Sequence, residues 1–158
     1  MINLNKYIYN YFLFLFSIIP ITIILGSAVS LFNIFLIDFL FIILLIYKKN
    51  FFFLKNKTIS YLFILYIYLI FNSFISIDYS ESIFRNLGFL RIIILFIAFN
   101  YFYHQKSFFQ KMFKSWLLII LIVIFDVYFE FLYGKNILGY DGSEYGQRIV
   151  SFFKDEPI

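Results

Sequence analysis

One stretch of the sequence, residues 7–47, carries a single charged side chain, Asp38. A membrane-spanning helix needs about 20 apolar residues, so this stretch is long enough for two such helices joined by a tight turn. The turn is predicted within residues 25–30, where glycine and serine weaken a helix and permit the chain to reverse. Pro20 predicts a kink inside the first helix, because proline lacks the backbone N–H that an interior helical position donates.

The rest of the chain has the same apolar character. Of its 158 residues, 63% are hydrophobic, and the mean hydropathy is +0.91. A soluble domain of this size leaves much of its surface in water, so we expect an integral membrane protein. The absence of cysteine excludes disulfides and thiolate metal sites. The single histidine, His104, leaves no histidine cluster for a metal, and we expect neither a metal nor another cofactor.

Charged residues alternate with the apolar segments instead of forming one basic patch, which argues against nucleic-acid binding. Five spans are predicted, at about residues 7–25, 29–47, 59–77, 87–103 and 116–132. The expected fold is therefore an all-α integral membrane protein with about five transmembrane helices, forming a single transmembrane region over residues 1–158. Membrane lipids are its expected surroundings.

The lysines predict how the spans are oriented. If the N-terminus is inside, the cytoplasmic segments contain no acidic residue and contain Lys6, Lys48, Lys49, Lys55, Lys57, Lys106, Lys111 and Lys114. This distribution obeys the positive-inside rule in every loop, and the opposite orientation would violate it. We therefore expect the N-terminus inside and the C-terminal segment, residues 133–158, outside as an external loop.

An ionisable group inside a membrane span costs free energy on insertion, so each one needs a stabilising interaction or a functional role. Asp38 is predicted either to pair with a cation on another helix, to form a structural hydrogen bond or to be protonated. Asp126 and Glu130 are four residues apart and so share one helix face. Paired carboxylates at this spacing can perform acid–base chemistry, coordinate a cation or act as counter-ions for arginines.

Two arginines are predicted near the outer end of the fourth span. Arg85 precedes Arg91 by six residues, and both would then lie close to the membrane surface. Their planar guanidinium groups are suited to bidentate recognition of a phosphate or diphosphate. The alternative for Arg91 is that its side chain extends outward to the polar surface without binding a ligand.

The last third of the sequence contains a recognisable pattern. Asp126 is followed by "YFEFLYGKNILGY" at residues 128–140 and by "RIVSFFKDEPI" at residues 148–158. This pattern resembles the bacterial O-antigen ligase and O-antigen polymerase superfamily, in which such a helix end leads to an arginine-containing motif. The matching positions are Gly134, Asn136, Gly139, Arg148, Phe153 and Pro157. Ser151 stands where the family often has glycine, and residues 76–96 resemble an arginine-bearing span of the family.

The resemblance implies a function. Such enzymes transfer a glycan from an undecaprenyl diphosphate carrier to an acceptor at the outer face of the bacterial inner membrane. The acceptor is lipid A-core for a ligase, or another lipid-linked polysaccharide repeat for a polymerase, and the sequence leaves both open. Carried over to this chain, the diphosphate-binding residue is Arg148, with Arg91 and Arg85 as weaker candidates.

The same resemblance implies a longer protein. Members of the family have about a dozen spans and an external histidine in their second half, whereas His104 is predicted at a cytoplasmic end. No catalytic residue is assigned for this reason. We expect this chain to be the N-terminal portion of a multi-span glycosyltransferase-like bundle whose external loop is truncated.

The alternative is a non-enzymatic multi-span membrane protein, such as a transporter subunit or an assembly partner. Asp38, Arg91 and Asp126 suit that class as well, because transporters place ionisable residues within their spans. A transporter predicts charges that converge near the middle of the membrane. A transferase predicts that Arg148, Arg91 and Arg85 meet at the outer surface.

Overall fold

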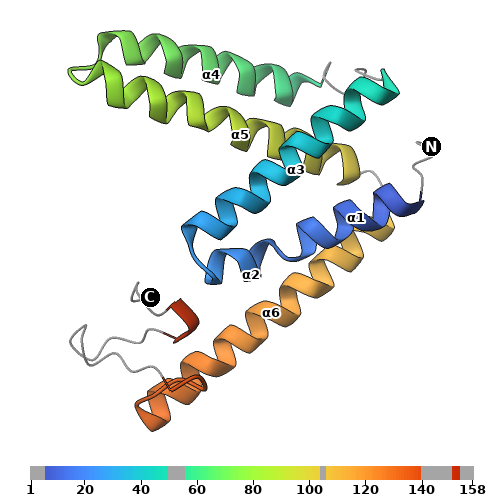
Figure 1. Ribbon diagram of the computed structural model, residues 1–158, viewed down its shortest axis with the longest axis vertical. Helices are drawn as coiled ribbons and strands as arrows, with labels where there is room; N and C mark the ends of the chain where they lie inside the picture. The colour runs from blue at the N-terminus through green and yellow to red at the C-terminus, as the bar shows by residue number, and fades with distance from the viewer. Residues whose placement is uncertain (1–5, 50–55, 104–105, 140–150, 154–158) are drawn as a thin grey trace. The chain divides into compact units, whose positions relative to one another are not determined.

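The computed structural model describes residues 6–49, 56–103, 106–139 and 151–153 (Figure 1). Within these ranges the chain is helical and contains no strand. The elements are α1 (Lys6–Ser17), α2 (Ile19–Ile24), α3 (Ser27–Lys48), α4 (Lys57–Ile75), α5 (Tyr79–Tyr103), α6 (Lys106–Tyr133) and the 3₁₀ helix η3 (Ser151–Phe153). Five segments are long and apolar enough to cross a membrane, namely α1 with α2, and each of α3 to α6. This agrees with the all-helical fold and the number of spans expected from the sequence.

Two helices begin well before the apolar segments that predicted them. α5 begins at Tyr79 instead of about residue 87, and α6 begins at Lys106 instead of about residue 116. The predicted limits followed apolar side chains, whereas glutamate, glutamine and lysine are also good helix formers. The segment containing Arg85, expected to be a loop, is therefore the first part of α5.

The first span is interrupted where Pro20 predicted a kink. α1 ends at Ser17, and Pro20 lies in the first turn of α2. A proline at position 20 cannot donate a hydrogen bond to the carbonyl of Phe16, four residues earlier. Instead, the Trp116 indole Nε1 donates to the Phe16 carbonyl at 2.8 Å, and Asn33 Nδ2 donates to the neighbouring Leu15 carbonyl at 3.3 Å. Side chains of other helices thus satisfy the carbonyls at the interruption, as a membrane interior requires.

The reversal between the first two spans occurs at Gly26, which has a φ of 116°. This left-handed conformation is accessible to glycine without steric cost, and α3 begins at the next residue. The tight turn predicted from the glycine and serine residues is therefore found.

The described residues divide into two compact units, of which the first comprises residues 6–33, 107–139 and 151–153. In this unit α1 and α6 lie side by side and run in the same direction. Tyr9 Oη and Ser107 Oγ are 3.0 Å apart at their N-terminal ends, and Trp116 meets Phe16 further along both helices. The Phe108 ring packs edge-on against the rings of Tyr9 and Phe16, with centroids 5.5 and 5.7 Å apart.

The second unit comprises residues 34–49, 56–103 and 106. Its helices α4 and α5 form an antiparallel hairpin (Figure 1). Asn86 of α5 holds this hairpin together, because its Nδ2 donates to the Leu69 carbonyl at 2.9 Å and to Ser73 Oγ at 2.6 Å on α4. The C-terminal part of α3 packs on α5, where the Phe41 ring meets those of Tyr101 and Phe102.

Small residues contribute unequally to the helix contacts. Ala98 is completely buried in the second unit, as expected for a small residue at a membrane helix interface. Gly88 of the same helix faces open space, since a Cβ added to it would meet no atom within 4 Å. Close packing within α5 is therefore concentrated in its C-terminal half.

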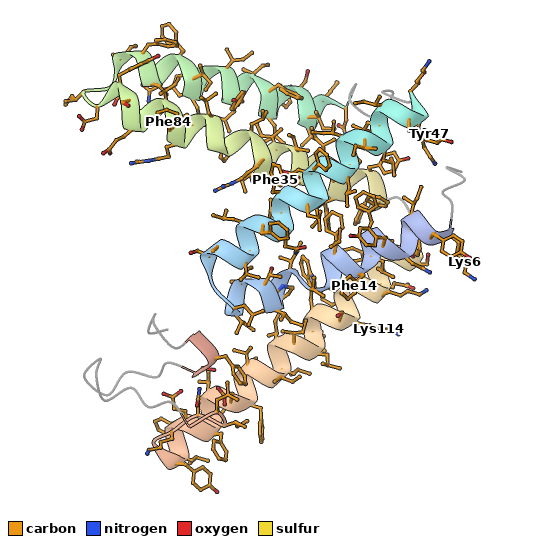
Figure 2. All side chains as sticks on the ribbon, in the orientation of Figure 1. Lys6, Phe14, Phe35, Tyr47, Phe84 and Lys114 are labelled. Atoms are coloured by element: carbon orange, nitrogen blue, oxygen red, sulfur yellow. The ribbon has the colours of Figure 1, made fainter. Side chains whose placement is uncertain are left out.

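Many large apolar side chains on these helices are exposed. Phe14, Phe35 and Phe84, labelled in Figure 2, are 59%, 64% and 72% exposed. A chain in water would bury such side chains, whereas hydrocarbon solvates them. These surfaces fit the bilayer environment that the composition predicts.

Candidate functional site

Four polar side chains are buried together where α6 ends. Asp126 and Ser151 are fully buried, and Glu130 and Asn136 are 4% and 3% exposed. We call these four residues the Ser151 clamp. Asp126 and Glu130 share one face of α6, as their four-residue spacing predicts, whereas Asn136 and Ser151 follow in the chain after the helix has ended.

Ser151 is held by all three of its hydrogen-bonding groups. Its hydroxyl Oγ donates to Asp126 Oδ2 at 2.7 Å, and its backbone N–H donates to Glu130 Oε2 at 2.5 Å. Its carbonyl accepts a hydrogen bond of 2.5 Å from Asn136 Nδ2. Three hydrogen bonds, two of them to side chains of α6, therefore hold this residue against the end of that helix.

The same carboxylate also shapes the turn that follows the helix. Asp126 Oδ1 accepts a hydrogen bond of 2.9 Å from the backbone N–H of Ile137. Gly134 and Gly139, with φ values of 76° and 86°, adopt the left-handed conformation at either side of this turn. Glycine suits both positions, since it adopts this conformation readily.

Ser151 itself has a φ of 48°. This left-handed conformation costs a residue with a Cβ roughly 1–2 kcal/mol, and it favours glycine. The hydrogen bond from the Ser151 hydroxyl to Asp126 offsets part of that cost. Ser151 therefore has a backbone conformation that glycine would adopt without this cost.

The clamp gives Asp126 and Glu130 a structural role. Both carboxylates accept hydrogen bonds from a backbone N–H, and Asp126 also accepts from the Ser151 hydroxyl. This role is not among those that the sequence suggested, which were acid–base chemistry, cation coordination and pairing with arginines. Glu130 and Asn136 make further interactions as well. The sequence predicted the two acids and Asn136 as parts of a pattern, but it gave no sign that Ser151 would be their common partner.

The three arginines predicted to bind a diphosphate are only partly described. Arg148 lies outside the described residues, as does His104. Arg85 and Arg91 belong to α5 in the second unit, and both side chains are exposed. Arg91 is twelve residues from either end of α5, which is about 18 Å at 1.5 Å per residue. It therefore lies at the middle of this helix, whereas the shorter predicted span placed it near one end.

Asp38 is a third buried acid, located on α3 in the second unit. Its side chain is 5% exposed, and neither carboxylate oxygen has a hydrogen-bond partner among the described residues. The positive charge of Arg91 acts on this carboxylate through space. Of the roles predicted for Asp38, a structural hydrogen bond is thus not found within the described part of the chain.

The described residues contain no group of three or more histidine, cysteine, aspartate or glutamate side chains arranged to hold a metal ion. Comparison with known proteins gives no match to a protein-family model, to a curated protein or to a solved structure. What the chain does has therefore to be inferred from its own residues.

Proposed function

We propose that this chain is the N-terminal membrane portion of an enzyme that transfers a glycan from an undecaprenyl diphosphate carrier to an acceptor sugar. The observation that carries this proposal is the Ser151 clamp. It joins Asp126, Asn136 and Ser151, which come from the two sequence segments that resemble the O-antigen ligase and polymerase superfamily. A resemblance due only to biased composition would give no reason for these residues to meet in one buried site.

The backbone of the clamp supports the proposal further. The resembling family often has glycine at the position of Ser151, and this residue adopts a φ that favours glycine. Gly134 and Gly139 of the same pattern also have positive φ values. Three positions of the pattern, Gly134, Gly139 and Ser151, thus have the positive φ that glycine adopts readily.

In this proposal the clamp fixes the chain next to the diphosphate-binding arginine. Arg148 precedes Ser151 by three residues in the sequence, and the clamp holds Ser151 to the end of α6. Departure of the carrier diphosphate develops negative charge, which a preorganised guanidinium stabilises. Arg85 and Arg91 are the weaker candidates for the same role. The clamp acids act here as positioning residues, and the base that deprotonates the acceptor hydroxyl is not assigned.

The reaction is proposed at the outer face of the bacterial inner membrane, with the N-terminus inside and the C-terminal segment outside. Lys6, Lys111 and Lys114 are exposed toward the N-terminal ends of the parallel helices α1 and α6, and Figure 2 labels the first and the last of them. Lysines gathered at one end of two parallel spans support the proposal that this end is cytoplasmic. The opposite end of α6, which carries the clamp, would then be external.

The test replaces Arg148 in the complete reading frame that contains this chain. We expect Arg148→Ala to abolish glycan transfer from the lipid-linked donor in membrane vesicles, while the protein still inserts. Arg148→Lys should retain only part of the activity, because lysine cannot hold a diphosphate in bidentate fashion. Lys135→Ala is the matched control, since Lys135 is an exposed cation in the same region. Full transfer by Arg148→Ala would remove this arginine from the site.

A second candidate function is favoured by a separate observation. Asp38 and Arg91 both lie in the middle part of their helices, and their charges interact. Charges near the middle of spans are typical of transporters. For a transporter subunit, Asp38→Asn would abolish function and Arg148→Ala would not, whereas the transferase predicts the opposite pair of results.

A further inference from the structure

Asp38 is the one acid among the described residues that is both buried and left without a hydrogen bond to its carboxylate. It lies within the 22-residue helix α3, with its side chain 5% exposed and both oxygens unpartnered. By contrast, the buried carboxylates of the Ser151 clamp accept hydrogen bonds from a hydroxyl and from backbone N–H groups. Whatever stabilises Asp38 is therefore different from what stabilises Asp126 and Glu130.

An ionised carboxylate with no partner is strongly destabilised in a membrane interior, because nothing there replaces its hydration. Three kinds of partner can remove this cost. They are a cation in direct contact, a bound metal ion and a proton. The surroundings of Asp38 in the second unit distinguish between them.

Within the described part of the chain, Asp38 forms no direct ion pair. The charged groups on the helices of this unit are few, and they comprise Lys48 on α3, Lys57 on α4, and Glu81, Arg85 and Arg91 on α5. Arg91 is the group whose charge acts on Asp38, yet neither Asp38 oxygen is hydrogen-bonded to it. Tyr101, on the part of α5 that packs against α3, is a neutral titratable group of the same contact region.

A metal ion does not suit the site either. Hard cations take six or more oxygen ligands, and the described residues contain no cluster of acidic or histidine side chains that could supply them. Arg91 would also repel a second cation. A proton needs only one carboxylate oxygen, and it neutralises the charge at that oxygen.

We infer that Asp38 is a proton-binding site in the membrane-embedded part of the second unit, and that Arg91 competes with the proton for its carboxylate. Proton binding converts the carboxylate to a neutral carboxylic acid, and loss of the proton restores the attraction to Arg91. The protonated and ionised forms of Asp38 thus differ in one O–H bond and in the electrostatic attraction between Asp38 and Arg91. This inference is independent of glycan transfer and of Arg148.

The experiment measures the protonation state of Asp38 by infrared spectroscopy of the whole chain in lipid vesicles. We expect a protonated-carboxyl band at neutral pH that is lost in Asp38→Asn. The matched control is Asp78→Asn, which removes an exposed aspartate and should leave the band unchanged. A band that persists in Asp38→Asn, or that is missing from the wild-type protein, would overturn the inference.

Arg91→Gln tests the competition separately. Without the guanidinium, a larger fraction of Asp38 should be protonated at the same pH, because the charge that favoured the carboxylate is gone. An unchanged fraction would exclude a role for Arg91. Asparagine is nearly the same size as aspartate, whereas glutamine is shorter than arginine. Circular dichroism of each variant verifies that its helices are retained. Since the readout is spectroscopic, a failure here is distinguishable from a failure of the transferase proposal.

Discussion

Trp116 is predicted to stabilise the fold by completing the helix that Pro20 interrupts. The perturbation is Trp116→Phe, which keeps an aromatic ring but removes the indole N–H that donates to the Phe16 carbonyl at 2.8 Å. A typical intramolecular hydrogen bond contributes about 1 kcal/mol, and those between membrane helices average about 0.6 with a maximum near 1.7. We therefore expect Trp116→Phe to lower the free energy of unfolding by about 1–2 kcal/mol, including some loss of packing.

A second substitution isolates the hydrogen bond from the packing. In Pro20→Ala the backbone N–H of residue 20 is restored, and it can donate to the same Phe16 carbonyl. Trp116→Phe should then cost about 1 kcal/mol less than it does in the wild-type background, because that carbonyl keeps a partner. The packing lost with the indole is common to both backgrounds and cancels from the difference.

The assay is reversible unfolding of the purified chain in mixed micelles with increasing denaturing detergent, followed by far-ultraviolet circular dichroism. Tryptophan fluorescence cannot serve for all four proteins, since Trp116 is the only tryptophan in the chain. Equal costs of Trp116→Phe with and without Pro20 would refute the assignment. The indole would then stabilise the fold through its bulk and not through the carbonyl of Phe16.

Two further substitutions test the hairpin and the clamp. Asn86→Leu should lower the stability of the α4–α5 hairpin by about 0.5–1.5 kcal/mol in the same unfolding assay. Asn72→Leu is the control, because Asn72 is exposed on α4, and it should leave the stability unchanged. Equal effects of the two substitutions would contradict the role of Asn86. Ser151→Val should loosen the clamp more than Ser151→Gly does. Both variants lose the hydrogen bond to Asp126, but glycine adopts the left-handed conformation without strain, whereas valine does not. The measurement is hydrogen exchange at the Ile137 amide, and a valine variant that protects it as well as glycine would contradict the explanation.

The spans were predictable because each depends on a local property, the length of an apolar run. The turn at Gly26 and the interruption at Pro20 were predictable for the same reason, since glycine and proline act on their own segment of backbone. The starts of α5 and α6 were not, because polar residues such as Glu81 and Lys111 continue a helix beyond its apolar part.

The candidate site was predictable only on its helical side. The four-residue spacing of Asp126 and Glu130 places both acids on one face of α6 whatever else the chain does. Their common partner Ser151 is 21 residues beyond Glu130, and no helical periodicity connects positions separated by a loop. The role of Arg148 stays a prediction.

The pairing of α1 with α6 has a consequence for how the protein is made. The Phe16 carbonyl and its donor Trp116 are 100 residues apart in the sequence. At a synthesis rate of about 5–20 residues per second, the first span waits on the order of 5–20 s before the helix that completes it emerges. The Leu15 carbonyl waits less, because its donor Asn33 follows after 18 residues. α1 thus reaches its final packing only after α3, α4 and α5 have been made, and a ribosome that stalls before α6 would leave it unfinished.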